Sequence, residues 1–267
     1  MLDGEELSSL INKYYTKLSS SDRRIFKMYV ETLKDIKKQM IEHSSKMSAN
    51  STLNDWYRGD RLATLEKEIE IKIKELMLNV ADEVEKTAIN TTIKFDKEFA
   101  KMLTKAYPGA DSFSSLNEEV IKELVNENWL GTDFYERCGH KGINLTYDMK
   151  NVLRTGIIQG KSIANIIKDM EVKAGKYYKE CETIVRSEVM HSLNSSVTQQ
   201  YKDMGATSIE HYTCEDERVC KVCSKLHGKR YLIDKAPKLP SSTHPKCRCT
   251  YLVTESSIEY AIKRLKK

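Results

Sequence analysis

Apolar residues recur every three or four positions through the first 110 residues, which is the period of an amphipathic helix. The spacing predicts helices over about 7–18 and 25–40, a polar loop over 44–55, and a longer helix from 62 to Tyr107. Stripes of this kind are typical of a helical bundle, because the apolar faces must pack against one another. The amino-terminal region is therefore predicted to be scaffold.

The helical period continues through the middle of the chain. It predicts helices over about 115–128, 146–156, 162–170 and 178–204, and a connection carrying aromatic anchors over 128–138. Gly205 suits the end of the last helix, where a glycine can adopt a left-handed conformation.

The stretch Gly160-Lys161-Ser162 has the residue types of a phosphate-binding loop. That loop needs a glycine where Thr155 stands, and a strand where these flanks are helical. We interpret the stretch as a helix break at Gln159-Gly160, followed by a Ser162 cap.

Beyond Gly205 the period changes. The runs SIEHYTC, KRYLI and CRCTYLVT are short, rich in β-branched and aromatic residues, and separated by Gly and Pro, which predicts a small antiparallel sheet. A closing basic helix is predicted after it, with Ser256 and Glu259 spaced as a capping box. The fold class is predicted as α+β: a mostly helical amino-terminal region followed by a small cysteine-rich α+β module.

Length and composition favour a folded protein of a reducing compartment. The 267 residues are 40% hydrophobic, enough to bury a core. We expect no signal peptide at the start MLDGEELSSL, and no membrane association, because no stretch approaches 18 apolar residues. In a reducing cytoplasm, clustered cysteines favour metal ligation over disulfides.

Four of the seven cysteines fall between Val219 and Thr250. Cys220-x2-Cys223 can place two thiolates about 3.5 to 4 Å apart on one turn, and His244-x2-Cys247 offers a second pair, as in a zinc ribbon or knuckle. Cys249 is a further donor, so the choice among His244, Cys247 and Cys249 stays open. The alternative is that reduced thiols only pack in a small sheet. Three other cysteines are predicted to be single buried thiols: Cys138, Cys181 and Cys214.

Charge is distributed unevenly. Residues 210–267 hold 13 basic and 7 acidic residues, whereas the rest holds 31 and 32. A basic end is a hint of a polyanion nearby, for which DNA bound without sequence specificity is the candidate. The candidate DNA contacts are Lys263, Arg264, Lys266 and Lys267.

Glu188 and His191 are three residues apart on a predicted helix, as in carboxylate-bridged metal sites. Those sites need two such pairs and further glutamates, and the sequence offers one pair. The favoured interpretation is a set of polar contacts at a helix face.

The order of these motifs resembles the phage minor head protein family, the head-morphogenesis proteins similar to the Mu F protein. The stretch NWLGTDFYERC comes first, then IVRSEVMHSLNSS, TCEDERVCKVCSKLHGK and HPKCRC. The residues that match the family motifs are Arg186, Glu188, Asp216, Cys220, Cys223, Gly228, His244, Pro245, Cys247, Arg248 and Cys249, with Ser187 in place of a threonine. The resemblance covers about Trp129 to Tyr251.

The resemblance implies a division into a helical region, 1–112, that docks to portal or capsid, and a Mu F-like domain, 113–267, with its Cys/His cluster at 214–249. It implies a structural, non-enzymatic minor head protein. Its implied location is the virion, inside the head, and the host cytoplasm during assembly. The implied partner is the portal protein, with the major capsid or scaffolding protein possible, and the implied role is head assembly and DNA packaging or delivery. No small-molecule substrate is implied. Some members carry an ADP-ribosyltransferase domain after the cysteines; because this sequence ends 18 residues past Cys249, none is expected.

Two other functions remain open from the sequence. In a zinc-dependent nuclease or other metal enzyme, His227, His244 and Asp216 would have to converge around an open coordination position. A zinc-ribbon DNA-binding protein is the second, although no helix-turn-helix pattern accompanies the cysteines. Structural zinc is the cofactor that our interpretation predicts.

Overall fold

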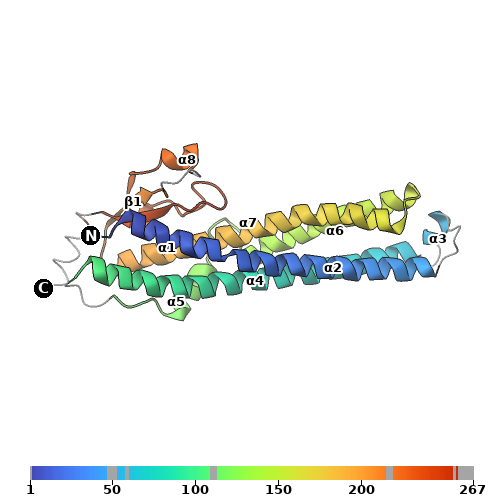
Figure 1. Ribbon diagram of the computed structural model, residues 1–267, viewed down its shortest axis with the longest axis horizontal. Helices are drawn as coiled ribbons and strands as arrows, with labels where there is room; N and C mark the ends of the chain where they lie inside the picture. Colours follow the sequence, from blue (N-terminus) through green and yellow to red (C-terminus); the bar gives the residue numbers. More distant parts are fainter. Residues whose placement is uncertain are drawn as a thin grey trace. The chain divides into compact units, whose positions relative to one another are not determined.

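The computed structural model describes residues 2–46, 53–57, 60–108, 113–214, 219–254 and 257. In chain order its helices are α1 (Gly4–Lys17), α2 (Ser19–Ser45), α3 (Leu53–Tyr57), α4 (Arg61–Ala106), α5 (Glu118–Val125), α6 (Phe134–Ile158), α7 (Ile163–Asp203) and α8 (Lys221–Ser224) (Figure 1). The strands are β1 (Ser208–Tyr212), β2 (Arg230–Leu232) and β3 (Thr250–Val253). The predicted α+β class is confirmed.

The chain divides into two compact units that do not follow its order. Unit 1 contains Met1–Ser19, Val84–Asp133 and Thr183–Lys267, and unit 2 contains Ser20–Glu83 and Phe134–Glu182. The helices α4 and α7 each contribute residues to both units. The predicted division at residue 112, which rests on family resemblance, stays a prediction.

Unit 2 consists of helices held by apolar stripes. Ile36 of α2, Ile69 of α4 and Leu153 of α6 are among its fully buried side chains. Glycine allows close helix contact at Gly156, where an added Cβ would lie 2.5 Å from Ile166 Cγ1. The unit is therefore stabilised chiefly by removal of apolar surface from water.

The helix break between α6 and α7 is confirmed. Gly160 has a φ of 64°, and the Ser162 hydroxyl accepts the Asn165 amide at 3.3 Å as a cap. Lys161 pairs with Asp169 at 2.8 Å. The segment is therefore a turn between two helices and not a phosphate-binding loop, as the sequence predicted.

Unit 1 packs α1, the second half of α4 and the second half of α7 around aromatic residues. Phe99 stacks on Phe95 and meets the ring of Tyr201 edge-on. Within this core the fully buried Asp96 accepts hydrogen bonds from Ser196 and Gln200 of α7. A buried carboxylate needs such partners, so this contact fixes α7 against α4.

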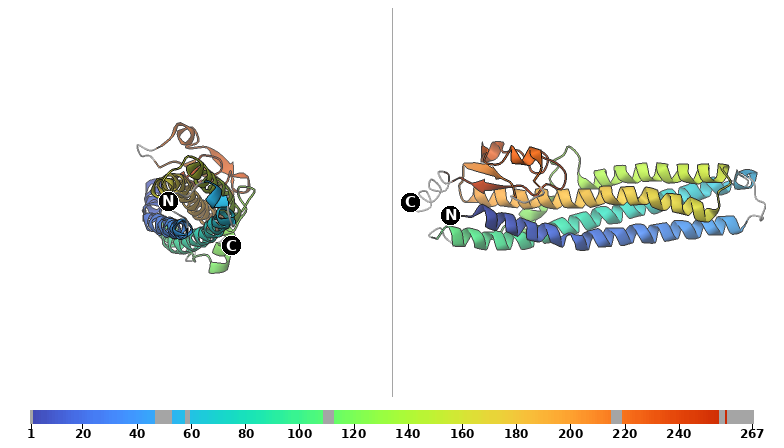
Figure 2. Two further views of the ribbon diagram at one scale, coloured as in Figure 1. Left: turned by 90° about the vertical axis from the view of Figure 1, so that its right-hand side faces the viewer. Right: turned by 45° about the horizontal axis from the view of Figure 1, so that its top comes forward.

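The predicted antiparallel sheet is also confirmed. Its order is β2-β1-β3, with Ile209 opposite Tyr231 on one side and Val253 on the other. Figure 2 shows the strands beside the carboxy-terminal part of α7, within unit 1. The inner positions Ile209 and His211 of β1 are buried, as the two-residue period of a strand requires.

Three predicted boundaries were wrong. Helix α6 begins at Phe134, so part of the expected connection is helical, and its buried stripe runs through Cys138 and Gly142. The two helices predicted over 162–170 and 178–204 are one helix, α7, because Met170, Ala174, Tyr177 and Cys181 continue a single stripe. Helix α5 is shorter than predicted, since Asn117 caps it by accepting the Val120 amide.

Some predicted features lie outside the described residues. These are Asp216, the candidate DNA contacts Lys263, Arg264, Lys266 and Lys267, and the closing helix with its capping pair Ser256 and Glu259. Among the residues described, no helix is both long enough and apolar enough to cross a membrane.

Candidate metal centre

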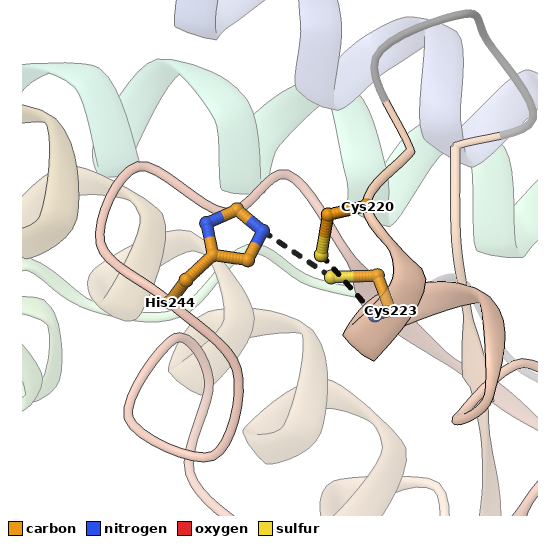
Figure 3. Close-up of side chains that lie close together, drawn as sticks. All are labelled: Cys220, Cys223 and His244. Carbon is orange, nitrogen blue, oxygen red and sulfur yellow. Dashed lines mark hydrogen bonds between the residues drawn. The ribbon is translucent and has the colours of Figure 1, made fainter.

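The first half of the cysteine cluster is a single helical turn. Cys220 is the N-cap of α8, and its Sγ accepts the backbone N–H of Cys223 at 3.3 Å. This bond turns the two thiols of the Cys-x2-Cys motif toward the same side, as Figure 3 shows. The local sequence therefore builds half of a chelating site before any tertiary contact is made.

The second half comes from the loop that precedes β3. His244 Nε2 lies 3.3 Å from Cys223 Sγ (Figure 3). Cys247 Sγ lies 3.6 Å from the same sulfur. The donor atoms form two groups that share Cys223: Cys220, Cys223 and His244, and Cys223, Cys247 and Cys249, each within 4.8 Å. The five predicted ligands are thus brought together.

These distances match a tetrahedral metal. Zinc with sulfur ligands at about 2.3 Å and nitrogen at about 2.0 Å places the donors about 3.5 to 3.8 Å apart. The observed 3.3 and 3.6 Å are close to those values. Cys223, Cys247 and Cys249 are buried and Cys220 is partly buried, so the site can exclude much of the solvent. The cluster fits a metal ion.

Two of the four clustered cysteines have a lowered pKa, which favours the thiolate, and two have a raised pKa, which favours the thiol. The Cys223 amide lowers the pKa of Cys220, and hydrogen bonding by Cys249 lowers the pKa of Cys247 to about 5. Burial raises the pKa of Cys223 to about 12, and the Cys247 thiolate raises that of Cys249. Without a cation, one thiolate therefore suppresses ionisation of its neighbours. A divalent ion reverses this, because its charge stabilises several thiolates together.

The orientation of His244 also suits ligation. Its Nδ1 donates to the Pro245 carbonyl oxygen at 2.9 Å, which leaves Nε2 facing Cys223 with its lone pair. An imidazole ligand is normally oriented in this way by a hydrogen bond from its other nitrogen. Burial lowers the pKa of His244, but the Pro245 carbonyl and the negative charge of Cys247 outweigh it and the pKa is raised.

Helix α7 holds this loop through polar side chains seven residues apart. Ser187 Oγ accepts the Lys246 amide at 3.2 Å, and Asn194 Nδ2 donates to the Cys249 carbonyl at 3.1 Å. The Tyr201 hydroxyl donates to the Tyr251 carbonyl at 3.3 Å. Lys246 has a φ of 63°, a strained conformation for a residue with a side chain. The contact with Ser187 stabilises that strained turn between His244 and Cys247.

The Arg-Ser-Glu motif at 186–188 connects α7 to three segments. The Arg186 guanidinium lies over the Tyr15 ring at 4.8 Å. Ser187 contacts the cysteine loop, as described above. Glu188 is 2% exposed, and its Oε2 accepts the Trp129 indole N–H at 2.8 Å. All three residues of the motif therefore have a positioning role in unit 1.

Arg248 and Cys214 form a further contact beside the cluster. Arg248 donates to Asn12 Oδ1 of α1 at 2.7 Å, and the Cys214 thiol donates to the Arg248 carbonyl at 3.3 Å. Cys214 belongs to neither donor group. The predicted burial of Cys138, Cys181 and Cys214 is confirmed.

The pair Glu188 and His191 makes polar contacts on α7, as the favoured interpretation predicted. His191 stacks on Trp129 with ring centroids 4.4 Å apart. Its Nδ1 donates to the Leu239 carbonyl at 3.0 Å, so Nε2 is left to face both Glu127, at 3.2 Å, and Ser195, at 3.4 Å. In a catalytic triad the acid and the nucleophile contact opposite nitrogens of the ring. This group therefore lacks the arrangement of a triad.

Sequence reasoning missed Ser187, Asn194 and Trp129 as positioning residues. The available signal was the polar run SLNSS at 192–196 within a predicted helix. In the structure every side chain along 184–201 of α7 is at least partly buried. A helix covered on all sides must satisfy its polar side chains with neighbouring segments. The seven-residue spacing of Ser187, Asn194 and Tyr201 marks the face that does so.

Comparison with known proteins finds a similarity over this region. Residues 147–252 match the model for phage Mu protein F like proteins. A curated relative, the NAD(+)--arginine ADP-ribosyltransferase EFV of Enterococcus faecalis (strain ATCC 700802 / V583), is 24% identical over 97% of this chain. The chain spans 56% of the length of that relative. No solved structure matches.

The matched range contains α7, β1, β2, most of β3 and the five clustered donors, and it carries all the ordered sequence motifs except the first, NWLGTDFYERC. Residues 147–252 of this chain are similar to the phage Mu protein F like family.

Proposed function

We propose that this chain is a structural minor head protein of a tailed phage or prophage. The observation that supports it is the family match over 147–252, which coincides with a cysteine cluster fixed to a long scaffold helix. The Mu F-like family is one of phage head proteins. The proposed location is the virion, inside the head, with assembly in the host cytoplasm.

The proposed cofactor is one structural zinc ion held by Cys220, Cys223, His244 and Cys247. Two thiol positions receive backbone N–H donors, since the Cys223 amide contacts Cys220 Sγ and the Cys249 amide contacts Cys247 Sγ at 3.5 Å. Such donors stabilise a metal-bound thiolate. His244 Nε2 and Cys223 Sγ already face each other, so these two ligands need little movement to bind the ion. Cys249 then supports Cys247 through its amide.

This centre is proposed to be structural because protein donors fill a tetrahedron. A catalytic zinc keeps a position open for water or substrate and needs a base beside it. A metal enzyme would need His227 to converge with His244, but neither donor group of the described residues includes His227. Its Nδ1 instead accepts from the Thr213 hydroxyl at 3.0 Å. Nuclease assays with Mg²⁺, Mn²⁺ and Zn²⁺ are expected to show no cleavage of duplex or single-stranded DNA.

The proposed partner is the portal protein of the same phage or prophage. The helical region 1–112 is proposed to dock, with the major capsid or scaffolding protein as a further contact. Co-expression with a tagged portal tests this, with an unrelated portal as the control. Recovery of the chain with its own portal supports the proposal; no recovery, together with absence from purified particles by mass spectrometry, would contradict it.

Non-specific DNA binding through the basic end is a separate part of the proposal. Each Lys or Arg that contacts phosphate releases counterions, so affinity should fall with salt at a slope of about −0.9 per contact. Changing Lys263, Arg264, Lys266 and Lys267 to Gln should flatten that slope and leave portal recovery unchanged. Loss of portal recovery with an unchanged slope would assign the basic end to protein docking.

An NAD-dependent transferase is the second candidate, favoured by the name of the Enterococcus relative. The polar residues of unit 1 argue against it, because Glu188 is committed to Trp129 and Arg186 to Tyr15. Incubation with labelled NAD⁺ and arginine, alone and with host lysate, tests it. Transfer of label would replace the structural proposal.

A further inference from the structure

Unit 2 carries an apolar groove between two antiparallel helices. Tyr135 of α6 donates to Asp82 of α4 at 2.9 Å, and further along, Lys150 pairs with Glu70 at 2.6 Å. Between these contacts lies a groove of about 620 Å³. We call it the α4–α6 groove; its apolar lining includes Met77, Leu78, Ala81, Ile143 and Tyr147.

Two glycines shape the groove. Gly142 lets α6 lie close to α4, since a Cβ there would be 2.7 Å from Met77 Cγ. Gly139 leaves the groove open, because a Cβ built on it meets nothing within 4 Å. Ile143, one turn further along α6, and Tyr147, two turns further, project and are each 67% exposed. The same helix face therefore has a hollow at one end and bulky side chains at its centre and other end.

Exposed apolar residues scattered singly need no partner, but a contiguous groove of this kind marks an interaction surface. The lining positions on α6 are 135, 136, 139, 140, 142, 143, 146, 147 and 150, and they include the series 136, 139, 143, 146 and 150 at three- and four-residue spacing. That spacing is what one helix presents to another across a packed seam. A helix is therefore the element that fits the groove.

We propose that the occupant is α6 of a second copy of this chain, related by a two-fold axis at Ile143. In an antiparallel pair about that axis, each residue faces the one equally far on the other side. Ile143 then meets Ile143, and Tyr147 of each copy faces the hollow at Gly139 of the other. The projecting groups and the hollows match within one surface, which is the requirement for a two-fold interface.

The charges at the ends of the seam agree with this arrangement. The same axis places Glu136 opposite Lys150, twice in the dimer. Both residues line the groove. Lys150 already contacts Glu70, so Glu136 of the second copy would add a second carboxylate to the same ammonium. Had the signs at 136 and 150 been equal, two like pairs would have opposed this pairing.

Sedimentation equilibrium of the full chain tests the proposal. From about 1 to about 100 µM the wild-type chain should pass from monomer to dimer, the range of a small apolar interface. Ile143→Glu should raise the dissociation constant at least about a hundredfold, because two isoleucines are lost and two carboxylates face each other. Val172→Glu is the matched control: Val172 is 72% exposed on α7 and does not line the groove.

A charge exchange tests the register of the pair. Glu136→Lys should weaken the dimer about threefold to tenfold by opposing Lys150, and adding Lys150→Glu should restore it. Glu171→Lys, which makes the same charge change outside the groove, should have no effect.

Far-UV circular dichroism verifies that every variant is folded. A monomeric wild-type chain throughout the range would overturn the proposal, whether the groove is then free, covered by another segment or used by another protein. A dimer insensitive to Ile143→Glu and to the charge exchange would also overturn it.

Discussion

The helices of unit 2 and the cysteine segment 219–254 of unit 1 are stabilised in different ways. Unit 2 buries long apolar stripes, with Ile36, Ile69 and Leu153 nearly inaccessible to solvent. In the cysteine segment, by contrast, three of the buried side chains are cysteines, and its loop is fixed by hydrogen bonds from its backbone to α7. A segment with so little apolar burial needs another source of stability, and the proposed metal ion would supply it. The two regions should therefore respond to different perturbations.

The largest expected effect is loss of the metal. Cys223→Ser removes the donor shared by both groups. Because metal binding in small modules contributes about 10 kcal/mol or more, the segment should unfold while the helices of unit 2 persist. Hydrogen exchange should show loss of protection over 219–254 and retained protection in α2 and α6. Cys214→Ser, beside the cluster but outside it, should keep its metal. Equal unfolding of both regions would contradict the comparison.

The reverse perturbation acts on the apolar core. Ile69→Ala should destabilise unit 2 by about 2 to 5 kcal/mol, because it leaves a cavity in a packed helix interface. Metal content should stay that of the wild-type chain. Urea unfolding followed by circular dichroism measures the loss of stability, and elemental analysis of the same sample measures the metal content. Loss of metal would show that the cluster depends on the helical core more than we infer.

Acid should weaken unit 1 through His211. This side chain is buried on β1, its ring nitrogens have no hydrogen-bond partner, and burial lowers its pKa from 6.5 to about 4. The unfolded chain therefore binds the proton more readily, and stability is lost as pH falls from about 6.5 toward 4. Between pH 7 and 5 the loss should be about 2 kcal/mol, from a shift of this size.

His211→Phe, which keeps a ring against Tyr251, should remove that part of the pH dependence. Urea unfolding of both proteins across this pH range gives the difference, in which protonation of the metal ligands cancels. Identical pH dependence would show that His211 has a partner in solution.

The smallest effect should come from the contact between Ser187 and the strained turn. Ser187→Ala leaves the Lys246 amide without its acceptor and should cost about 1 to 2 kcal/mol. Metal affinity should fall about tenfold, as for other residues that orient ligands. Competition with a chromophoric chelator measures it. Thr198→Ala is the control, since that hydroxyl bonds within α7 to the Asn194 carbonyl. Adding Lys246→Gly should recover part of the loss by relieving the strained φ.

The sequence predicted the parts whose signal is local. The stripes of α1, α2 and α4 follow the helical period, and the alternation of β1 follows the strand period. The start of α6 was missed because its stripe passes through Cys138 and Gly142, which do not look apolar in a pattern. Helix α7 was divided at a polar stretch near Gly175, although its buried face continues.

The candidate site divides in the same way. The spacing of Cys220 with Cys223 and of His244 with Cys247 is local, and from it the sequence predicted that these residues bind a metal ion together. The contacts of Ser187 and Asn194 with that loop join residues 55 to 59 positions apart, and no pattern along the chain encodes them. Polar residues on a covered helix indicate that partners exist without indicating which ones.

X-ray absorption at the zinc edge, on protein purified without chelators, tests the central claim most directly. A closed structural centre predicts about one zinc per chain, with three sulfur ligands and one nitrogen ligand from Cys220, Cys223, His244 and Cys247. A folded chain without metal would contradict the claim, as would a shell with an oxygen ligand, which indicates an open position. A shell of four sulfurs would contradict the assignment of His244 and would indicate Cys249 as the fourth ligand.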